Sequence, residues 1–373
     1  MPAPTKTCCL LALLVLSAHA QSSNLKGKKL VEFGWDEPDT AFLRAHIAEM
    51  QRSPFDGCVF HADYHRPDGT QGSFSWQCWG TNAFVQGDLA GAFLDLQAVR
   101  LGHFNHNFLR FNTTPGRLDW FDDHGAVIQN AKLAAQLARA GHCPGILFDI
   151  EQYEGPLFEY HKQRDAETKS WELYAAQVRR RGSEVMHAFQ EGYPNLTVFL
   201  TFGYSLPWHE TSNGKKALAD CRYGLLAPFL DGLISAASGH TRLVDGFELS
   251  YGYKSAAQFS TARREVTQDL TPIVRDEDKY RERFSLAFGL WLDHDWRKAG
   301  WNSERPEQNY FSPEILFATV REALQIADEY VWIYSETPRW WSAEGPPVKL
   351  PADYGYALLK AKGIVKTNTG DSP

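Results

Sequence analysis

The sequence predicts an α/β fold, a single (β/α)8 TIM barrel, on three observations. Short apolar runs rich in β-branched and aromatic residues alternate with longer amphipathic stretches along the whole chain. Each kind of segment occurs eight times, which is the count of this barrel. The richest Pro/Gly stretch, Gly345-Pro346-Pro347, follows the last apolar run and does not divide the chain. We therefore expect residues 21–373 to form one barrel domain with a short C-terminal tail.

The expected strands are apolar runs that become small or polar toward their C-terminal ends. They are residues 30–36, 57–63, 107–113, 145–153, 197–204, 244–251, 285–293 and 330–336. The expected helices carry apolar residues at helical spacing. They are residues 39–52, 88–101, 124–140, 166–191, 215–236, 255–270, 312–328 and 353–362. Local signals support the first, third and seventh: Asp39 and Ser312 are N-cap residues, Pro313 suits the first helical position, and Gly141 suits a C-cap.

Residues 1–20 match a secretory signal peptide. Lys6 supplies the positive charge, residues 8–16 an apolar stretch, and Ala18-His19-Ala20 a cleavage site. The apolar stretch is too short to cross a bilayer, and no later stretch approaches ~20 apolar residues. We therefore expect a secreted or periplasmic protein that is not inserted in a membrane.

Composition and charge narrow the classes of partner. With 43% hydrophobic and 22% charged residues the chain is of ordinary globular composition, which excludes disorder and coiled coil. Its 38 Lys and Arg against 45 Asp and Glu give a formal net charge of −7. No Lys/Arg-rich stripe interrupts this acidic balance, so we expect no nucleic-acid partner.

Four cysteines remain after the leader: Cys58, Cys78, Cys143 and Cys221. An oxidising compartment would allow them to pair, and Cys58–Cys78 closes the shortest loop. A core of this size does not need disulfides, so buried free thiols are the open alternative. None of the four has the spacing of a zinc site.

On each expected strand, alternate residues, which point to the same side of the sheet, are small or polar near the C-terminal end. The active site of such a barrel lies at these ends. Ionised groups inside apolar runs are unfavourable unless they are paired or used. A functional barrel mouth explains the pattern better than solvated strand ends and structural ion pairs. The residues expected to bind a substrate there are Glu32, His61, Asp63, Arg110, Asn112, Tyr153, Tyr251, Trp291, Asp293, Trp332, Trp340 and Trp341.

Four carboxylates are the candidate catalytic residues. Asp149 and Glu151 lie two apart on one strand and share a face, so the charge of one opposes ionisation of the other. Glu248 and Glu336 come from the sixth and eighth strands. Paired carboxyl groups are what glycoside hydrolysis requires. Flat aromatic rings suit the C–H faces of sugars, and Trp340-Trp341 in the loop after Glu336 is the favoured platform because loops are normally exposed.

The export signal, the barrel and Asp149-x-Glu151 resemble a TIM-barrel glycoside hydrolase. The spacing is similar to the end of the chitinase-type D-x-x-D-x-D-x-E strand, but Leu147 replaces an earlier acid, which argues against substrate-assisted chemistry. A pair on strands four and six, Asp149 or Glu151 with Glu248, is similar to the α-galactosidase-like clan. The Asn-Glu dipeptide of the largest glycosidase clan is absent from strand four.

The resulting hypothesis is an exported glycosidase that cleaves a poly- or oligosaccharide without a metal or cofactor. Glu151 is expected to be the general acid, with Asp149 as the adjacent charge that keeps it protonated. Glu248 or Glu336 would be the nucleophile or the water-activating base, and Arg110 would orient sugar hydroxyls.

Two alternatives stay open. His61-x-Asp63 with Asp36 and Asp293 could hold a divalent ion in a metal-dependent hydrolase. A barrel that binds carbohydrate without cleaving it would keep the aromatic residues but would not need four inward carboxylates.

Overall fold

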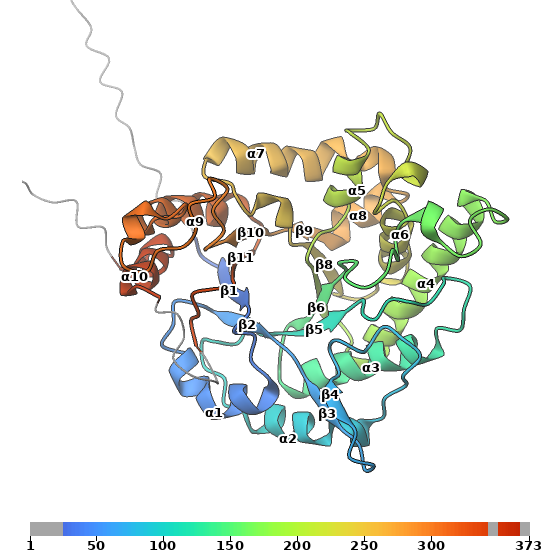
Figure 1. Ribbon diagram of the computed structural model, residues 1–373, viewed down its shortest axis with the longest axis horizontal. Coiled ribbons are helices and arrows are strands. Elements are labelled where there is room, and N and C mark those ends of the chain that lie inside the picture. The colour runs from blue at the N-terminus through green and yellow to red at the C-terminus, as the bar shows by residue number, and fades with distance from the viewer. Residues whose placement is uncertain (1–24, 342–349, 366–373) are drawn as a thin grey trace, which may run out of the picture.

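The computed structural model describes residues 25–341 and 350–365, so the predicted leader and the Gly345-Pro346-Pro347 stretch lie outside it. Helices surround a central parallel sheet whose strand order is β10-β11-β1-β2-β5-β6-β7-β8-β9 (Figure 1). The strands are β1 (Lys29–Gly34), β2 (Gly57–Phe60), β5 (Phe108–Asn112), β6 (Gly145–Asp149), β7 (Thr197–Leu200), β8 (Arg242–Asp245), β9 (Phe284–Leu286), β10 (Phe288–Trp291) and β11 (Tyr330–Ser335).

The predicted barrel class is confirmed, but the sheet has nine strands among the described residues where eight were predicted. The additional strand arises because one predicted strand is interrupted. β9 pairs with β8 and β10 pairs with β11, both in parallel. Only Ala287 separates β9 from β10, and its N–H donates to the carbonyl of Asp245 (2.8 Å). One sequence run therefore supplies two short strands and brings the two edges of the sheet together.

The helices follow the strands as the alternation predicts. They are α1 (Thr40–Met50), α2 (Ala90–Ala98), α3 (Gly125–Ala140), α4 (Trp171–Gly192), α5 (Ser205–Glu210), α6 (Leu226–Ala236), α7 (Ala256–Arg264), α8 (Glu277–Arg283), α9 (Pro313–Ile326) and α10 (Ala352–Ala361). The Asp39 side chain caps α1 by accepting the N–H of Phe42, and Ser312 caps α9 by accepting that of Ile315. The sequence missed α5 and α8, which are too short to show an apolar period.

Two boundaries differ from the prediction. The second strand ends at Phe60, and Asp63 belongs to a separate antiparallel hairpin of β3 (Asp63–His65) and β4 (Gln71–Ser73). The sixth strand ends at Asp245, so Glu248 lies in the short 3₁₀ turn Glu248–Ser250 and not on a strand. In both places the run of residues that predicted the strand continues beyond the last hydrogen bond between neighbouring strands. The types of the residues do not show where this pairing ends.

The barrel interior is filled by apolar side chains contributed by each barrel strand or its break. They are Val31, Phe33, Val59, Phe108, Leu147, Phe199, Val244, Ala287, Tyr330 and Trp332. On seven strands these residues point to the same side of the sheet as the polar residues that were predicted to face inward. On β6, for example, Leu147 and Asp149 lie on the same face. On those strands the polar C-terminal ends therefore continue the inner face of the barrel.

On β1 the predicted parity is wrong. Val31 and Phe33 fill the interior, so Glu32 points to the outer side of the sheet, where it is fully buried. Burial raises the pKa of Glu32 well above its ordinary value, and the nearby charge of Asp36 raises it further. The polarity of Glu32 suggested the mouth, whereas the two larger apolar residues beside it take the interior.

Cys58 and Cys78 are buried and free, as are Cys143 and Cys221, so the considered Cys58–Cys78 pair is wrong and the free-thiol alternative holds. Cys78 Sγ contacts the carbonyl oxygen of Asn112 at 3.0 Å. Within the two described ranges, every helix is too short or too polar to cross a bilayer.

Truncating Phe199 tests the filled interior. Phe199 is fully buried and its ring centroid lies 5.3 Å from Phe108 and 5.5 Å from Tyr330. We expect Phe199→Ala to lower the free energy of unfolding by about 3–5 kcal/mol, because it leaves a cavity that the closed sheet cannot collapse. Urea denaturation followed by circular dichroism measures the change. Leu94→Ala on the exposed face of α2 is the control and should stay within about 0.5 kcal/mol; equal losses would contradict the filled interior.

Candidate active site

A cavity of about 900 Å³ opens at the C-terminal ends of the barrel strands. Eight of the predicted site residues line it: His61, Arg110, Glu151, Tyr153, Glu248, Tyr251, Trp291 and Glu336. Others that the sequence analysis did not select also line it, notably Glu37, Ser73, Trp76 and Tyr334. The strand tips thus bring together carboxylates, one guanidinium and aromatic rings from distant parts of the chain.

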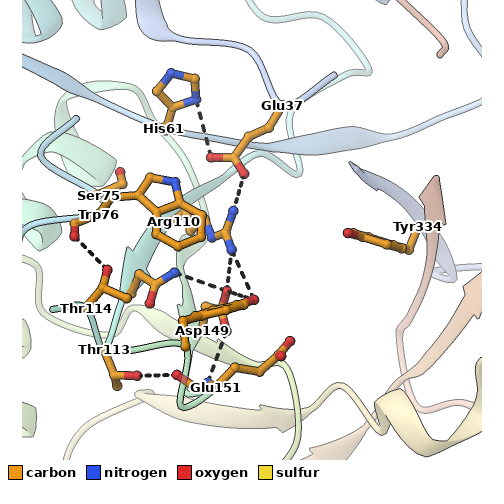
Figure 2. A network of polar contacts seen from close by, with 12 residues as sticks. Glu37, His61, Ser75, Trp76, Arg110, Thr113, Thr114, Asp149, Glu151 and Tyr334 are labelled. Carbon is orange, nitrogen blue, oxygen red and sulfur yellow. Dashed lines mark hydrogen bonds and ion pairs between the residues drawn. The ribbon is translucent and has the colours of Figure 1, made fainter. Parts of the chain in front are cut away.

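Arg110, on the inward face of β5, links two acids across the floor of this cavity (Figure 2). Its Nη1 donates to Glu37 Oε2 (2.8 Å) and its Nη2 donates to Asp149 Oδ2. The guanidinium also lies over the Trp76 ring, 4.4 Å from its centroid. Burial alone would lower the pKa of Arg110, but the charges of Glu37 and Asp149 outweigh it and raise the pKa.

Asp149, the last residue of β6, is fully buried and surrounded by donors. Besides Arg110, it accepts hydrogen bonds from Tyr153 Oη (3.1 Å) and Asn112 Nδ2 (3.4 Å), both at Oδ2, and from the N–H of Glu151 at Oδ1 (3.2 Å). These contacts fix the backbone that carries Glu151. Asp149 is therefore an anchored charge below the cavity and not one of its lining residues.

Glu151 extends from this anchor into the open space that faces Tyr334 (Figure 2). The Thr113 hydroxyl donates to its carbonyl oxygen (2.8 Å), which holds the turn after β6. Burial raises the pKa of Glu151 to about 7, and the neighbouring charge of Asp149 adds to the shift. A carboxyl group in this range can donate a proton near neutral pH.

Glu248 reaches the same cavity from the turn after β8. Phe247 adopts a left-handed conformation (φ 45°) and its N–H donates to Asp245 Oδ1 (2.9 Å), which redirects the chain into this turn. Burial raises the pKa of Glu248 well above its ordinary value, and the charge of Glu151 is the next cause. The Tyr251 hydroxyl donates to Glu248 Oε1 and opposes part of the shift.

Glu336 occupies another part of the wall, after β11. Its Oε1 accepts from Tyr334 Oη (3.3 Å), and its N–H donates to Asp293 Oδ1 (3.0 Å). Burial raises the pKa of Glu336, partly offset by the Tyr334 hydrogen bond. The charge of Asp293 raises its pKa further, and that of His294 lowers it. Glu336 thus has its own polar partners, Tyr334 and Asp293.

His61 and Glu37 form the side of the cavity opposite Glu151 (Figure 2). His61 Nδ1 lies 3.3 Å from Glu37 Oε1. Burial would lower the pKa of His61, but the hydrogen bond and charge of Glu37 raise it overall. Burial would likewise raise the pKa of Glu37, but the charge of Arg110 and the contact with His61 lower it. Glu37 is therefore a paired anion.

Aromatic rings stand at the rim of the cavity. Trp76 and Tyr153 pack together with centroids 5.3 Å apart and are 38% and 47% exposed. Trp35 is 62% exposed and its Nε1 donates to Tyr334 Oη (3.0 Å). Glu37 and Trp76 were not predicted from the sequence, because neither lies on the inward face of a predicted strand. Only the position of Glu37 directly after the Glu32–Asp36 run could have drawn attention to it.

Several predicted site residues lie away from the cavity surface. Trp341 is 7% exposed, and the backbone N–H groups of Trp340 and Trp341 donate to Asp36 Oδ2. The Trp340 ring packs on Phe55 (4.7 Å between centroids), so the predicted exposed platform is wrong. These rings are recruited to the core because Asp36 anchors the loop that carries them.

Trp332 lies inside the barrel, where its Nε1 donates to the carbonyl of Gly246 (2.8 Å). A Cβ at Gly289 would come within 2.6 Å of the Trp332 ring, so the absence of a side chain there makes room for it. Asn112 supports Asp149 from below. Asp63 in β3 lies 3.9 Å from His61 Nε2, and Glu32 faces the outer layer.

The residues of the metal-site alternative are not gathered into a metal-binding group. Asp36 accepts from Trp340 and Trp341, and Asp293 accepts from the N–H groups of Glu336 and Thr337. Among residues 25–341 and 350–365, three or more His, Cys, Asp or Glu side chains nowhere come together in a geometry that could hold a metal ion.

Comparisons with known proteins give structural likeness only. No family model matches the chain, and no curated protein matches it in sequence. A glucosidase from Croceicoccus marinus is similar over 92% of this chain and 68% of its own, at 10% identity and a TM-score of 0.49. A GH5_18 protein from Streptomyces cattleya is similar over 90% of this chain and 80% of its own, at 13% identity and a TM-score of 0.44.

A GH18 chitinase from Pseudoalteromonas aurantia is similar over 90% of this chain and the whole of its own, at 9% identity and a TM-score of 0.41. The resemblance predicted from the sequence is thus to the same class of proteins as these solved structures. At such identities and TM-scores they carry no argument about chemistry, which rests on the residues of the cavity.

Removing the charge of Asp149 tests the electrostatics of this site. We expect Asp149→Asn to lower the pKa of Glu151 from about 7, because an adjacent negative charge is lost and Arg110 loses a competing partner. Carbon-13 NMR titration of carboxyl-labelled glutamate measures the pKa without a substrate. Asp63→Asn removes a half-exposed carboxylate beyond His61 and is the matched control. An unchanged pKa in Asp149→Asn, or an equal decrease in the control, would contradict this assignment.

Proposed function

We propose that the protein is a glycoside hydrolase that cleaves a glycosidic bond of a poly- or oligosaccharide, with Glu151 as general acid. The observation that carries the proposal is the Glu151–Glu248 pair, two carboxyl groups in one cavity whose pKa values are both raised by burial, with the charge of Glu151 raising the pKa of Glu248 further. Two coupled carboxyl groups hold one proton between them over a range of pH. One acid and one carboxylate at a bond are what glycoside hydrolysis needs.

The contacts of each member support the division of roles. Glu151 projects into open space, where it can reach the oxygen of a leaving group. Glu248 receives a hydrogen bond from Tyr251, which stabilises its charged form and suits a nucleophile or a water-activating base. Glu336 acts with Asp293 and Tyr334 instead, so the proposal assigns Glu248 as the second catalytic carboxylate and Glu336 to sugar binding.

The walls of the cavity suit a sugar ring. Trp35, Trp76 and Tyr153 offer exposed aromatic faces for C–H groups. Ser73 and Trp291 line the cavity, and their polar atoms, Ser73 Oγ and Trp291 Nε1, are buried without a hydrogen-bond partner within the described part of the chain. Buried polar groups without partners are unfavourable, and a sugar hydroxyl would satisfy each of them. Export of the chain through its predicted leader belongs to the same proposal.

Replacing the proposed acid separates proton donation from other roles. We expect Glu151→Gln to reduce kcat on a natural glycan by about 10²–10⁴-fold. The loss should be much smaller on an aryl glycoside whose acidic leaving group departs without a proton. Glu248→Gln is the matched comparison and should lose activity on both substrates, because attack on the sugar is needed in either case.

A panel of glycans and aryl glycosides assayed by released reducing sugar and released phenol measures these losses. Equal losses of Glu151→Gln on the two substrates would remove it from the acid role. Binding of a glycan without turnover of any substrate by the unmodified protein would favour the carbohydrate-binding alternative.

The pH profile gives a second test. Glu151 must carry a proton to act as an acid, so kcat/KM should fall as pH rises through about 7. At low pH the second carboxyl group becomes protonated, and the rate should fall there too. Asp149→Asn should move the alkaline limb to lower pH, and Glu151→Gln should abolish that limb on the aryl glycoside. An alkaline limb that persists in Glu151→Gln would assign it to another group.

A further inference from the structure

A continuous series of aromatic rings leads from the cavity to the protein surface. It consists of Trp291, His294, Trp296 and Tyr310, which we call the aromatic track. Successive ring centroids lie 4.4 Å, 4.2 Å and 4.9 Å apart. Trp291 lines the cavity, so the track extends the cavity wall outward.

Trp296 is the most exposed ring of the aromatic track, and one side of it packs against the protein backbone. A Cβ at Gly252 would come within 3.2 Å of the indole carbons Cε2 and Cζ2 and 3.4 Å of Cδ2, so one side of the ring lies against the Gly252 backbone. Tyr310 Oη donates to the carbonyl of Gly252 (2.9 Å) and holds the neighbouring ring on the same backbone. Trp296 is nevertheless 44% exposed.

The charged side chains around the aromatic track are engaged with other partners, so the exposed surface of Trp296 is an apolar ring face. Lys254 Nζ lies 3.2 Å from the Tyr310 ring centroid and so covers a face of that ring. The Arg297 guanidinium is paired with the Asp295 carboxylate at 2.9 Å. A ligand that meets Trp296 therefore needs a flat apolar face with hydrogen-bonding groups at its edge, as a sugar ring has.

We propose that Trp296 is a second sugar platform, outside the cavity, which stacks on a unit of the glycan one or more residues away from the bond at Glu151. This inference rests on the proposed glycosidase function and deepens it. It makes the substrate a chain that extends out of the cavity along the aromatic track, and it makes affinity depend on chain length.

Calorimetric binding to the full chain carrying Glu151→Gln, which should slow cleavage by about 10²–10⁴-fold, tests the platform. The probes are disaccharide-to-hexasaccharide series derived from cellulose, xylan, mannan, chitin and β-1,3-glucan. We expect the affinity for one series to rise with length. Trp296→Ala should remove that rise, with a roughly three- to tenfold loss for the hexasaccharide and a smaller loss for the disaccharide. Trp296→Phe keeps a flat ring and should retain most of the affinity.

Tyr356→Ala removes a comparably exposed ring from α10 and is the matched control, with no expected change. Affinity that does not depend on length, or a loss in Trp296→Ala that is equal at every length, would overturn the platform while leaving the glycosidase proposal standing. Binding of none of the series, together with no turnover on the glycan panel, would overturn both.

Discussion

The structure of the cavity depends on the buried ion pairs of Arg110 with Glu37 and Asp149. The guanidinium comes from β5, and its two partners come from the loop after β1 and from the last residue of β6, so one side chain ties three parts of the barrel mouth together. Removing one partner of a buried pair leaves an uncompensated charge and destabilises a protein by about 3–5 kcal/mol. The same contacts orient the backbone that presents Glu151. A structural interaction thus also determines the geometry of the proposed catalytic group.

The carboxyl groups near Arg110 fall into two groups, according to whether they pair directly with its guanidinium. Arg110 contacts Glu37 and lowers its pKa against the effect of burial. Glu151 and Glu248 lie near the network but outside its direct ion pairs, and burial raises the pKa of both. The charge of Asp149 adds to the shift of Glu151, and the charge of Glu151 adds to that of Glu248. Proton donation becomes available near neutral pH because the nearby cation is already shared by other carboxylates.

Glu32 shows that a raised pKa by itself does not identify a catalytic acid. Its pKa is raised by burial and by Asp36, as that of Glu151 is raised by burial and by Asp149. However, Glu32 faces the outer side of β1, and it does not line the cavity at the C-terminal ends of the strands. Access to a substrate distinguishes the two positions, and the direction of a side chain from its strand decides that access.

The sequence by itself determined the barrel class, the positions of most strands and helices, and the inward parity of seven strands. These properties follow from apolar periodicity and capping residues, which act over a few neighbouring positions. It also brought Asp149, Glu151, Glu248 and Arg110 into one hypothesis, because polar residues at strand ends of a parallel barrel must converge. Tertiary structure alone decided the outward direction of Glu32, the burial of Trp340-Trp341 against Phe55 and Asp36, and the entry of Glu37 and Trp76 into the cavity. For Trp340-Trp341, Glu37 and Trp76 the deciding contact joins residues far apart in the chain, so the residue type at either position carries no sign of it.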